Sequence, residues 1–337
     1  MTAAHIALIL SLGLASSAQA LAAQAGWRQF TVAGASADAA ATTVALYYPT
    51  QAAARDVPMG PFTPHIAIQG EPEAKVKGLI VLSHGTGGSE LGHTSTAEAL
   101  AQSGYLVAAL RHPGDNWQDR SLLMVNPERY FDTRPQQVTR IIDALLRDPQ
   151  WKDRIASDAR GPRIGAIGHS AGGYTVLALA GGQPDPARIV RHCAAERAAD
   201  PIFCSLGRSA GTAMPASTSV PAPTADARVR AVAALAPLGV VFTAASLAAI
   251  RVPTVIYEAE ADRFLVPKFH AEWVAANMPQ ARMKRIANAW HFAFMDRPGM
   301  PILTEDGDIG ADPVGFDRAV FLAQLRSELV AFFDAAW

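Results

Sequence analysis

The strongest constraint on the fold is the alternation of short apolar segments with longer helical ones along the 337-residue chain. Several apolar segments are continuous and bounded by Gly or Pro, which is typical of strands covered on both faces of a sheet. Strands that alternate with helices predict an α/β fold with a mostly parallel central sheet and helices on both faces. The expected strands cover 42–49, 78–85, 104–113, 163–170, 229–237 and 252–259, and the expected helices cover 94–102, 135–146, 171–180, 267–276 and 314–333.

Two parts of the chain depart from this alternation. Residues 27–33 and 42–49 have no helix between them, which predicts an antiparallel hairpin at the edge of the sheet. Residues 182–228 are rich in Ala, Pro, Ser and Thr and show no regular period, apart from one candidate helix over 186–199. We therefore expect a single domain over 27–337, with a cap-like irregular insertion at 182–228 over one end of the sheet.

The N-terminus has the pattern of an export signal. An apolar run over 6–14 is followed by Ala18-Gln19-Ala20, a pattern that signal peptidases accept. The run is shorter than the roughly 20 apolar residues that span a bilayer, so no stable membrane insertion is expected. We predict a cleaved signal peptide over residues 1–20 and a periplasmic or secreted protein. Because the segment lacks Lys and Arg, a disordered or helical N-terminal tail is the alternative.

Composition and cysteine content limit the possible partners, the cellular compartment and the kinds of site that the chain can contain. The formal net charge is -1 and charged residues make up 18% of the chain, so neither disorder nor a nucleic-acid partner is expected. The chain has two cysteines, Cys193 and Cys204, which predict a local disulfide in an oxidising compartment, with two free thiols as the alternative. No cluster of His and Cys in the sequence supports a metal site.

The segment "RIGAIGHSAGGYTVLALAGG" points to chemistry. Ser170 lies between Gly168 and Gly172, where the expected strand becomes the expected helix. A nucleophilic serine needs a sharp strand-to-helix turn that exposes its hydroxyl, and small neighbours relieve the crowding of that turn. A glycine-rich turn without chemistry is the alternative. The strand before Ser170 and the helix after it favour the nucleophile.

A nucleophilic serine also needs a base that an acid orients, and in this architecture the acid and then the base follow the serine. His291 is the expected base, because His192 comes before any acid-bearing strand end and His270 falls inside an expected helix. Asp262 is the expected acid, because it follows the strand at 252–259 in a turn. The other acids in that turn are Glu258 and Glu260, of which Glu260 is the second choice.

The oxyanion of the tetrahedral intermediate needs two N–H donors. One is expected from Ala171, directly after the nucleophile, and the other from the glycine-rich segment "SHGTGG", where Thr86 is the best candidate. Ser83 and His84 of the same segment do not fall in the order that a triad requires. A structural hydrogen-bonding role is therefore expected for His84.

The motifs "SHGTGG", "VAALRHPGDN", "GHSAGGYT", "VPTVIYEAEADRFLVP" and "AWHFAF" occur in this order over roughly residues 44–333. Together they resemble the secreted α/β-hydrolases known as predicted dienelactone hydrolases, related to the platelet-activating-factor acetylhydrolases and distantly to cutinase-like polyester hydrolases. The resemblance implies an α/β-hydrolase fold and a serine esterase without a cofactor. It implies Ser170, Asp262 and His291 as the triad, Thr86 and Ala171 as the oxyanion donors, and Cys193 paired with Cys204. Arg111 departs from the family pattern, which has an acidic residue before "HPG".

The expected function is an exported esterase that cleaves short- to medium-chain carboxylic esters, either small molecules or polymers, through an acyl-enzyme. An amidase or peptidase on the same triad and a catalytically inactive binding module are the alternatives. Loops around 111–119 and 236–242 are expected to line the pocket. Trp117 and Trp290 are candidate pocket aromatics, with a place in the core as the alternative.

Overall fold

A computed structural model describes residues 23–36, 39–125, 129–206, 222 and 224–337 of the chain. The predicted signal peptide at 1–20 and most of 207–223 lie outside the described residues. Ten strands form one sheet in the order β12-β11-β10-β9-β5-β6-β2-β1-β4-β3. Their bounds are β1 Gln24–Val32, β2 Thr42–Thr50, β3 Arg55–Asp56, β4 His65–Ile68, β5 Leu79–Ser83, β6 Leu106–Arg111, β9 Ile164–His169, β10 Val229–Leu235, β11 Thr254–Ala259 and β12 Arg282–Ile286.

The six strands from β12 to β6 run parallel, as the alternation with helices predicts, whereas β2 is antiparallel to both β6 and β1. Two short hairpins lie outside this sheet, β7 Ser157–Asp158 with β8 Gly161–Pro162 and β13 Leu303–Thr304 with β14 Gly307–Asp308. The β1–β2 hairpin is antiparallel as expected, but its predicted position at the edge is wrong. The strand β4 adds to β1, and β3 lies beyond it.

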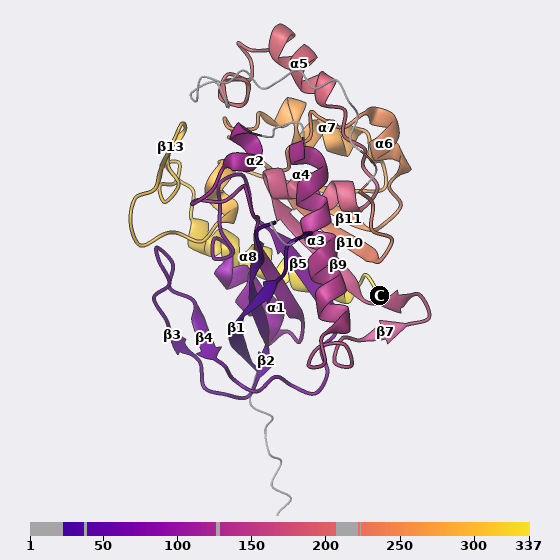
Figure 1. Cartoon of the computed structure of the whole chain (residues 1–337). Coiled ribbons are helices and arrows are strands. Elements are labelled where there is room, and N and C mark those ends of the chain that lie inside the picture. Colours follow the sequence, from indigo (N-terminus) through magenta and orange to yellow (C-terminus); the bar gives the residue numbers. More distant parts are fainter. Residues whose placement is uncertain (1–22, 37–38, 126–128, 207–221, 223) are drawn as a thin grey trace, which may run out of the picture.

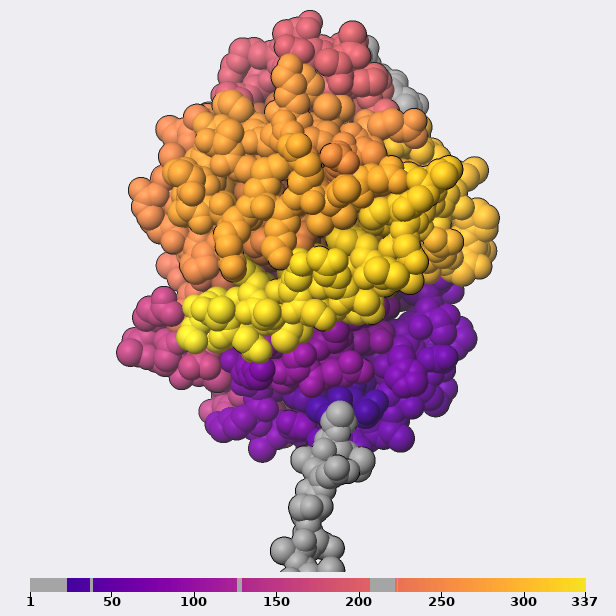
Figure 2. All heavy atoms as spheres, turned by 180° about the vertical axis from the view of Figure 1, so that it is seen from behind, coloured from indigo at the N-terminus to yellow at the C-terminus, as the bar shows by residue number. Residues whose placement is uncertain are grey.

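The helices are α1 Thr94–Gln102, α2 Ser121–Met124, α3 Tyr130–Arg147, α4 Ala171–Leu179, α5 Pro186–Ala195, α6 Ala244–Ala249, α7 Ala271–Ala276 and α8 Arg318–Asp334. They cover both faces of the sheet, and the side chains of the sheet are divided between two cores. Alternate residues of a strand enter opposite cores because successive side chains point to opposite faces. In β5, for example, Val81 packs in the core with α3 and α4, and Leu82 packs in the core with α1 and α8. Figure 1 shows α3 and α4 in front of the sheet, and Figure 2 shows the C-terminal helix crossing the opposite side.

Helix α3 begins at Tyr130, earlier than the predicted start at Pro135, so proline lies inside the helix. Proline has no N–H, which leaves the carbonyl oxygen four residues earlier without its helical donor. That oxygen belongs to Phe131, and the buried Tyr174 hydroxyl donates a hydrogen bond to it. A tertiary contact therefore compensates the proline, and the helix continues through it.

Two other predicted helices differ in extent. The segment predicted at 267–276 is a 3₁₀ turn, η3 Pro267–Phe269, followed by α7, and His270 separates them with non-helical backbone angles. The last helix was predicted from 314 but begins at Arg318, where Asp317 accepts a hydrogen bond from the Val320 N–H as an N-cap. No helix in the described part of the chain is long and apolar enough to cross a membrane.

The described part of the insertion after α4 lies beyond one end of the sheet, with α5 at its outer side (Figure 1). Helix α5 begins at the first residue of the predicted segment, with Asp185 as N-cap and Pro186 in the first turn. Cys193 of α5 forms a disulfide with Cys204, which confirms that part of the sequence analysis. His192 and the two cysteines place ligand-type atoms within 4.8 Å of one another, a grouping that the sequence did not predict. Because the sulfurs are bonded to each other, neither is a thiolate ligand.

Candidate active site

Ser170 lies at the turn between β9 and α4 with φ 58° and ψ -119°, a conformation that non-glycine residues rarely adopt. The turn is tight enough to require glycine on both sides. A Cβ on Gly168 would lie 2.0 Å from the Gly172 carbonyl oxygen, and a Cβ on Gly172 would lie 1.9 Å from the Ser83 carbonyl oxygen. The backbone of Ser170 is held by hydrogen bonds with Leu235 and Leu238. Such strain persists where surrounding structure fixes it, and it is common at functional sites.

His291 and Asp262 are joined by a 2.7 Å hydrogen bond between Nδ1 and Oδ2, and both side chains are buried. The other oxygen of Asp262, Oδ1, accepts hydrogen bonds of 2.8 Å from the Phe264 and Leu265 N–H groups. The Phe264 ring stacks on the imidazole with ring centres 5.0 Å apart. The carboxylate and the imidazole are therefore fixed in one relative orientation.

A second histidine holds the loop of His291. His169, next to Ser170, contacts the His291 carbonyl oxygen through Nε2 at 2.9 Å. Burial lowers the pKa of His169 well below its usual range, so the ring is neutral and Nε2–H donates this bond. No role for His169 was predicted from the sequence. Its place beside the motif serine was the available signal.

Ser170 and His291 line the same cavity, although no hydrogen bond joins the Ser170 hydroxyl to His291 in the described structure. Such bonds are often long in ligand-free enzymes and tighten when substrate binds. The other candidate acids lie in different environments. Glu260 is exposed and accepts a hydrogen bond from the Asn288 N–H, and Glu258 pairs with Arg285.

The two remaining candidate histidines lie outside the lining of this cavity. His192 and His270 both contact one oxygen of Asp200, at 2.8 and 3.0 Å. Asp200 and His270 are buried, and the Gly239 N–H donates to His270 Nδ1. These contacts connect the insertion to the start of α7, so His270 has a packing role, and it lies between η3 and α7 and not within the predicted helix.

The glycine-rich loop after β5 approaches the serine closely. A Cβ on Gly85 would lie 3.0 Å from Ser170 Cβ. Within the described residues, neither the Thr86 N–H nor the Ala171 N–H donates a hydrogen bond to the protein. The Thr86 hydroxyl, by contrast, is hydrogen-bonded to the Tyr130 hydroxyl at 2.7 Å. Both amides are therefore free to donate a hydrogen bond to a bound group.

His84 in this loop is buried and structural, as expected from the sequence. Its Nδ1 contacts the Gly85 carbonyl oxygen at 2.6 Å, and its Nε2 accepts from the His112 N–H. Burial lowers the pKa of His84 well below its usual range, because a charged imidazole would lose its hydration there. Arg111, which departs from the family pattern, pairs through two nitrogens with Glu90, so an acidic partner comes from another segment.

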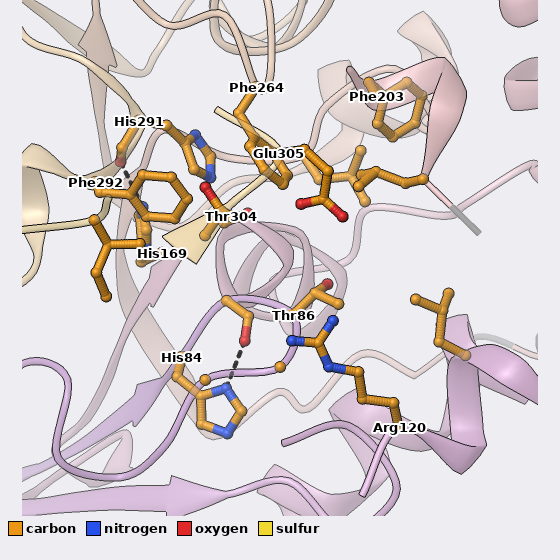
Figure 3. Close-up of a pocket in the computed structure, with 18 of the residues that line it drawn as sticks. His84, Thr86, Arg120, His169, Phe203, Phe264, His291, Phe292, Thr304 and Glu305 are labelled. Atoms are coloured by element: carbon orange, nitrogen blue, oxygen red, sulfur yellow. Dashed lines mark hydrogen bonds between the residues drawn. The ribbon is translucent and has the colours of Figure 1, made fainter. Parts of the chain in front are cut away.

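The cavity has a volume of about 840 Å³ and is mainly apolar, with Arg120 and Glu305 among its few charged residues. Figure 3 shows Phe264 beside His291 and Arg120 extending toward Thr86. Neither of the two candidate pocket aromatics, Trp117 and Trp290, lines the cavity. Trp290 is in the core, and Trp117 is exposed. Apolar lining comes from α2 and the start of α3, from the insertion and the loop after β10, from the segments beside the candidate acid and base, and from the β13–β14 hairpin with its flanking residues. It includes Leu123, Met124, Phe131, Ile189, Val190, Phe203, Leu206, Leu238, Phe264, Phe292, Met295, Ile302, Leu303 and Ile309.

Comparison with known proteins decides the family. Residues 80–301 match the model of the alpha/beta hydrolase family, and this range contains Ser170, Asp262 and His291. The chain belongs to the alpha/beta hydrolase family. This agrees with the fold predicted from the sequence, and it makes a hydrolase the coarse functional class of the chain.

Solved structures agree on the fold of this alpha/beta hydrolase. It is similar to a ferulic acid esterase from Streptomyces cinnamoneus, with 20% identity, a TM-score of 0.57 and coverage of 96% of this chain and 92% of the esterase. It is also similar to a dienelactone hydrolase from Anabaena variabilis, with 14% identity, a TM-score of 0.52 and coverage of 93% and 99%. No curated protein sequence matches the chain at a significant level.

Proposed function

We propose that this alpha/beta hydrolase is a serine esterase that cleaves carboxylic esters through an acyl-enzyme. The observation that carries the proposal is the buried Asp262–His291 hydrogen bond beside a cavity that also contains Ser170 in its strained turn. A nucleophile, a base and an orienting acid in this order are what nucleophilic acyl transfer requires. That one of the similar structures is named an esterase agrees with the substrate class.

The proposed reaction follows from these positions. Ser170 Oγ attacks the ester carbonyl carbon while His291 Nε2 takes the serine proton, and Asp262 keeps His291 in the tautomer with hydrogen on Nδ1. The Thr86 and Ala171 amides bind the oxyanion. Collapse of the intermediate expels the alcohol, which receives the proton from His291, and leaves an acyl group on Ser170. Water activated by His291 then releases the acid and restores the serine.

The cavity supports small or medium acyl groups. Its apolar lining provides binding energy for an acyl chain, and a volume of about 840 Å³ is within the range of small-molecule sites. The end of a polyester chain that enters this cavity is also among the proposed substrates. The insertion that partly lines the cavity is tied by the disulfide, and α5 has a single buried residue, Ile189.

We expect soluble short- and medium-chain esters to be hydrolysed faster than triglyceride droplets. A lid that opens on lipid needs a mobile helix with a broad apolar face. Helix α5 carries Arg188, Arg191 and His192 and is tied through the Cys193–Cys204 disulfide. The test is the rate with p-nitrophenyl esters of increasing acyl length and their amide analogues, and then with tributyrin across its solubility limit and with triolein. A jump in rate when droplets form, together with faster cleavage of triolein, would show that the insertion is a lipase lid. Faster cleavage of the amides would favour an amidase.

We also propose export, which the disulfide supports because such bonds persist in oxidising compartments. The mature protein is expected to begin shortly after Ala20 and to contain no free thiol. The two cysteines are 11 positions apart in the sequence. A disulfide that closes so short a loop lowers the entropy of the unfolded chain and so stabilises the fold by about 2–3 kcal/mol. Intact mass spectrometry of periplasmic material, alkylated with and without reduction, measures both features. Alkylation of both cysteines without reductant, or an uncleaved N-terminus, would contradict the respective part.

A further inference from the structure

A buried polar network lies behind both amides of the proposed oxyanion hole. Its centre is the ion pair of Asp115 and Arg134, whose side chains are fully buried. We propose that this pair and Tyr130 are positioning residues, which hold the Thr86 and Ala171 amides in the geometry that binds the oxyanion. The inference rests on the proposed function, because it assigns a role toward the intermediate formed on Ser170.

On the loop side, Asp115 holds both residues that follow Gly85. Its Oδ1 accepts a 2.9 Å hydrogen bond from the Gly87 N–H, and its Oδ2 accepts a 2.8 Å hydrogen bond from the Tyr130 hydroxyl. Since the Tyr130 proton is given to Asp115, the Thr86 hydroxyl must donate its own proton to Tyr130. Thr86 is thereby fixed through its side chain, and only its amide is left for the oxyanion.

Tyr130 keeps its proton over the whole working range of pH. Burial, and then the nearby Asp115 carboxylate, raise the pKa of Tyr130 above its usual range. Thr86 therefore donates its hydroxyl proton to Tyr130, and Tyr130 donates to Asp115, at every pH in this range. The contact of Tyr130 with Phe131 gives the phenol ring a packing role that does not depend on the hydroxyl.

Arg134 connects this loop to the start of α4. One terminal nitrogen pairs with Asp115, and the other donates to the His84 carbonyl oxygen, directly before the glycine loop. Its Nε donates at 3.1 Å to the Thr175 hydroxyl, which in turn donates at 2.9 Å to the Ala171 carbonyl oxygen. One rigid guanidinium thus contacts both segments that supply the oxyanion donors.

Stability alone does not account for a charged pair at this place. Burying two charges costs desolvation energy, and well-packed apolar side chains often replace such pairs without loss of stability. A catalytic amide, however, must be held within a fraction of an ångström, and hydrogen bonds behind it provide that precision. The network contacts the two donor segments and not the acid or base, so its effect is expected on binding of the tetrahedral species.

The test compares Tyr130→Phe with Tyr105→Phe. Both changes remove a buried tyrosine hydroxyl that donates at 2.8 Å to a carboxylate, but Tyr105 bonds to Asp334 and does not line the cavity. For Tyr130→Phe we expect kcat to fall about tenfold with KM changed less than about twofold, because the lost interaction acts in the transition state. The affinity for an alkylboronic acid, which forms a tetrahedral adduct with serine, should fall by the same factor. Tyr105→Phe should leave all three quantities unchanged.

Thr175→Val tests the α4 side in the same way, since it removes the hydroxyl between Arg134 and Ala171 while keeping the side-chain shape. We expect the same pattern, with lower kcat and weaker boronic acid binding. Unchanged kcat and boronic acid affinity in both Tyr130→Phe and Thr175→Val, or a change confined to KM, would overturn the inference. Ser170-dependent hydrolysis by the wild-type protein is measured first, because its absence would instead refute the proposed function.

Discussion

Replacing Ser170 by alanine is expected to lower ester hydrolysis by about four to six orders of magnitude, because removing one member of a triad disables the whole unit. The fold should persist. The Ser170 side chain makes no cap hydrogen bond to α4, so none is lost. The positive φ at this position strains alanine about as much as it strains serine. The thermal unfolding midpoint should therefore stay close to that of the wild type.

Labelling by a fluorophosphonate probe and hydrolysis of a p-nitrophenyl ester measure this effect directly. Ser89→Ala is the matched control, because Ser89 lines the same cavity and its hydroxyl accepts a hydrogen bond from the Leu91 N–H. That variant should keep both labelling and turnover. Full labelling of Ser170→Ala, with loss of labelling in Ser89→Ala, would move the nucleophile to the glycine-rich loop.

Local sequence signals were sufficient for the central strands and for the turn at Ser170. Continuous apolar runs ended by glycine have few alternatives to buried parallel strands, and the strands β5, β6, β9, β10 and β11 lie where these runs predicted them. The strand β4 was missed because its four residues are too few to show a period, and its pairing with β1 is a long-range contact.

The sequence predicted some of the residues at the candidate site and not others. The pairing of Asp262 with His291 was predicted from their order and the strand before the acid, whereas Asp115 and Arg134 gave no signal as a pair. Charged residues are usually exposed, and only the tertiary structure shows that these two bury each other. The β13–β14 hairpin and the insertion form cavity walls through contacts between distant segments, so the sequence could not decide between pocket and core for Trp117 and Trp290, and neither residue lines the cavity.

The orienting role of Asp262 leads to the second large expected effect. In Asp262→Asn, the amide oxygen can still accept the Phe264 and Leu265 N–H groups, as Oδ1 does now. The amide nitrogen would then occupy the place of Oδ2 and present a hydrogen to His291 Nδ1. His291 would respond by carrying its proton on Nε2, the atom that must accept the serine proton. We expect the fold to persist and kcat to fall by about 10⁴-fold, the scale of a wrong histidine tautomer.

Two comparisons make this prediction specific to Asp262. Glu260→Gln alters an exposed acid in the same turn, whose side chain accepts from the Asn288 N–H, and it should keep nearly full activity. Asp262→Asn in a His291→Ala background should cost little more than His291→Ala alone, because the acid acts only through the imidazole. Steady-state hydrolysis of a p-nitrophenyl ester by the four variants measures both comparisons. Near-normal turnover of Asp262→Asn together with a large loss in Glu260→Gln would assign the acid to Glu260, and additive losses in the double variant would show that Asp262 acts independently of His291.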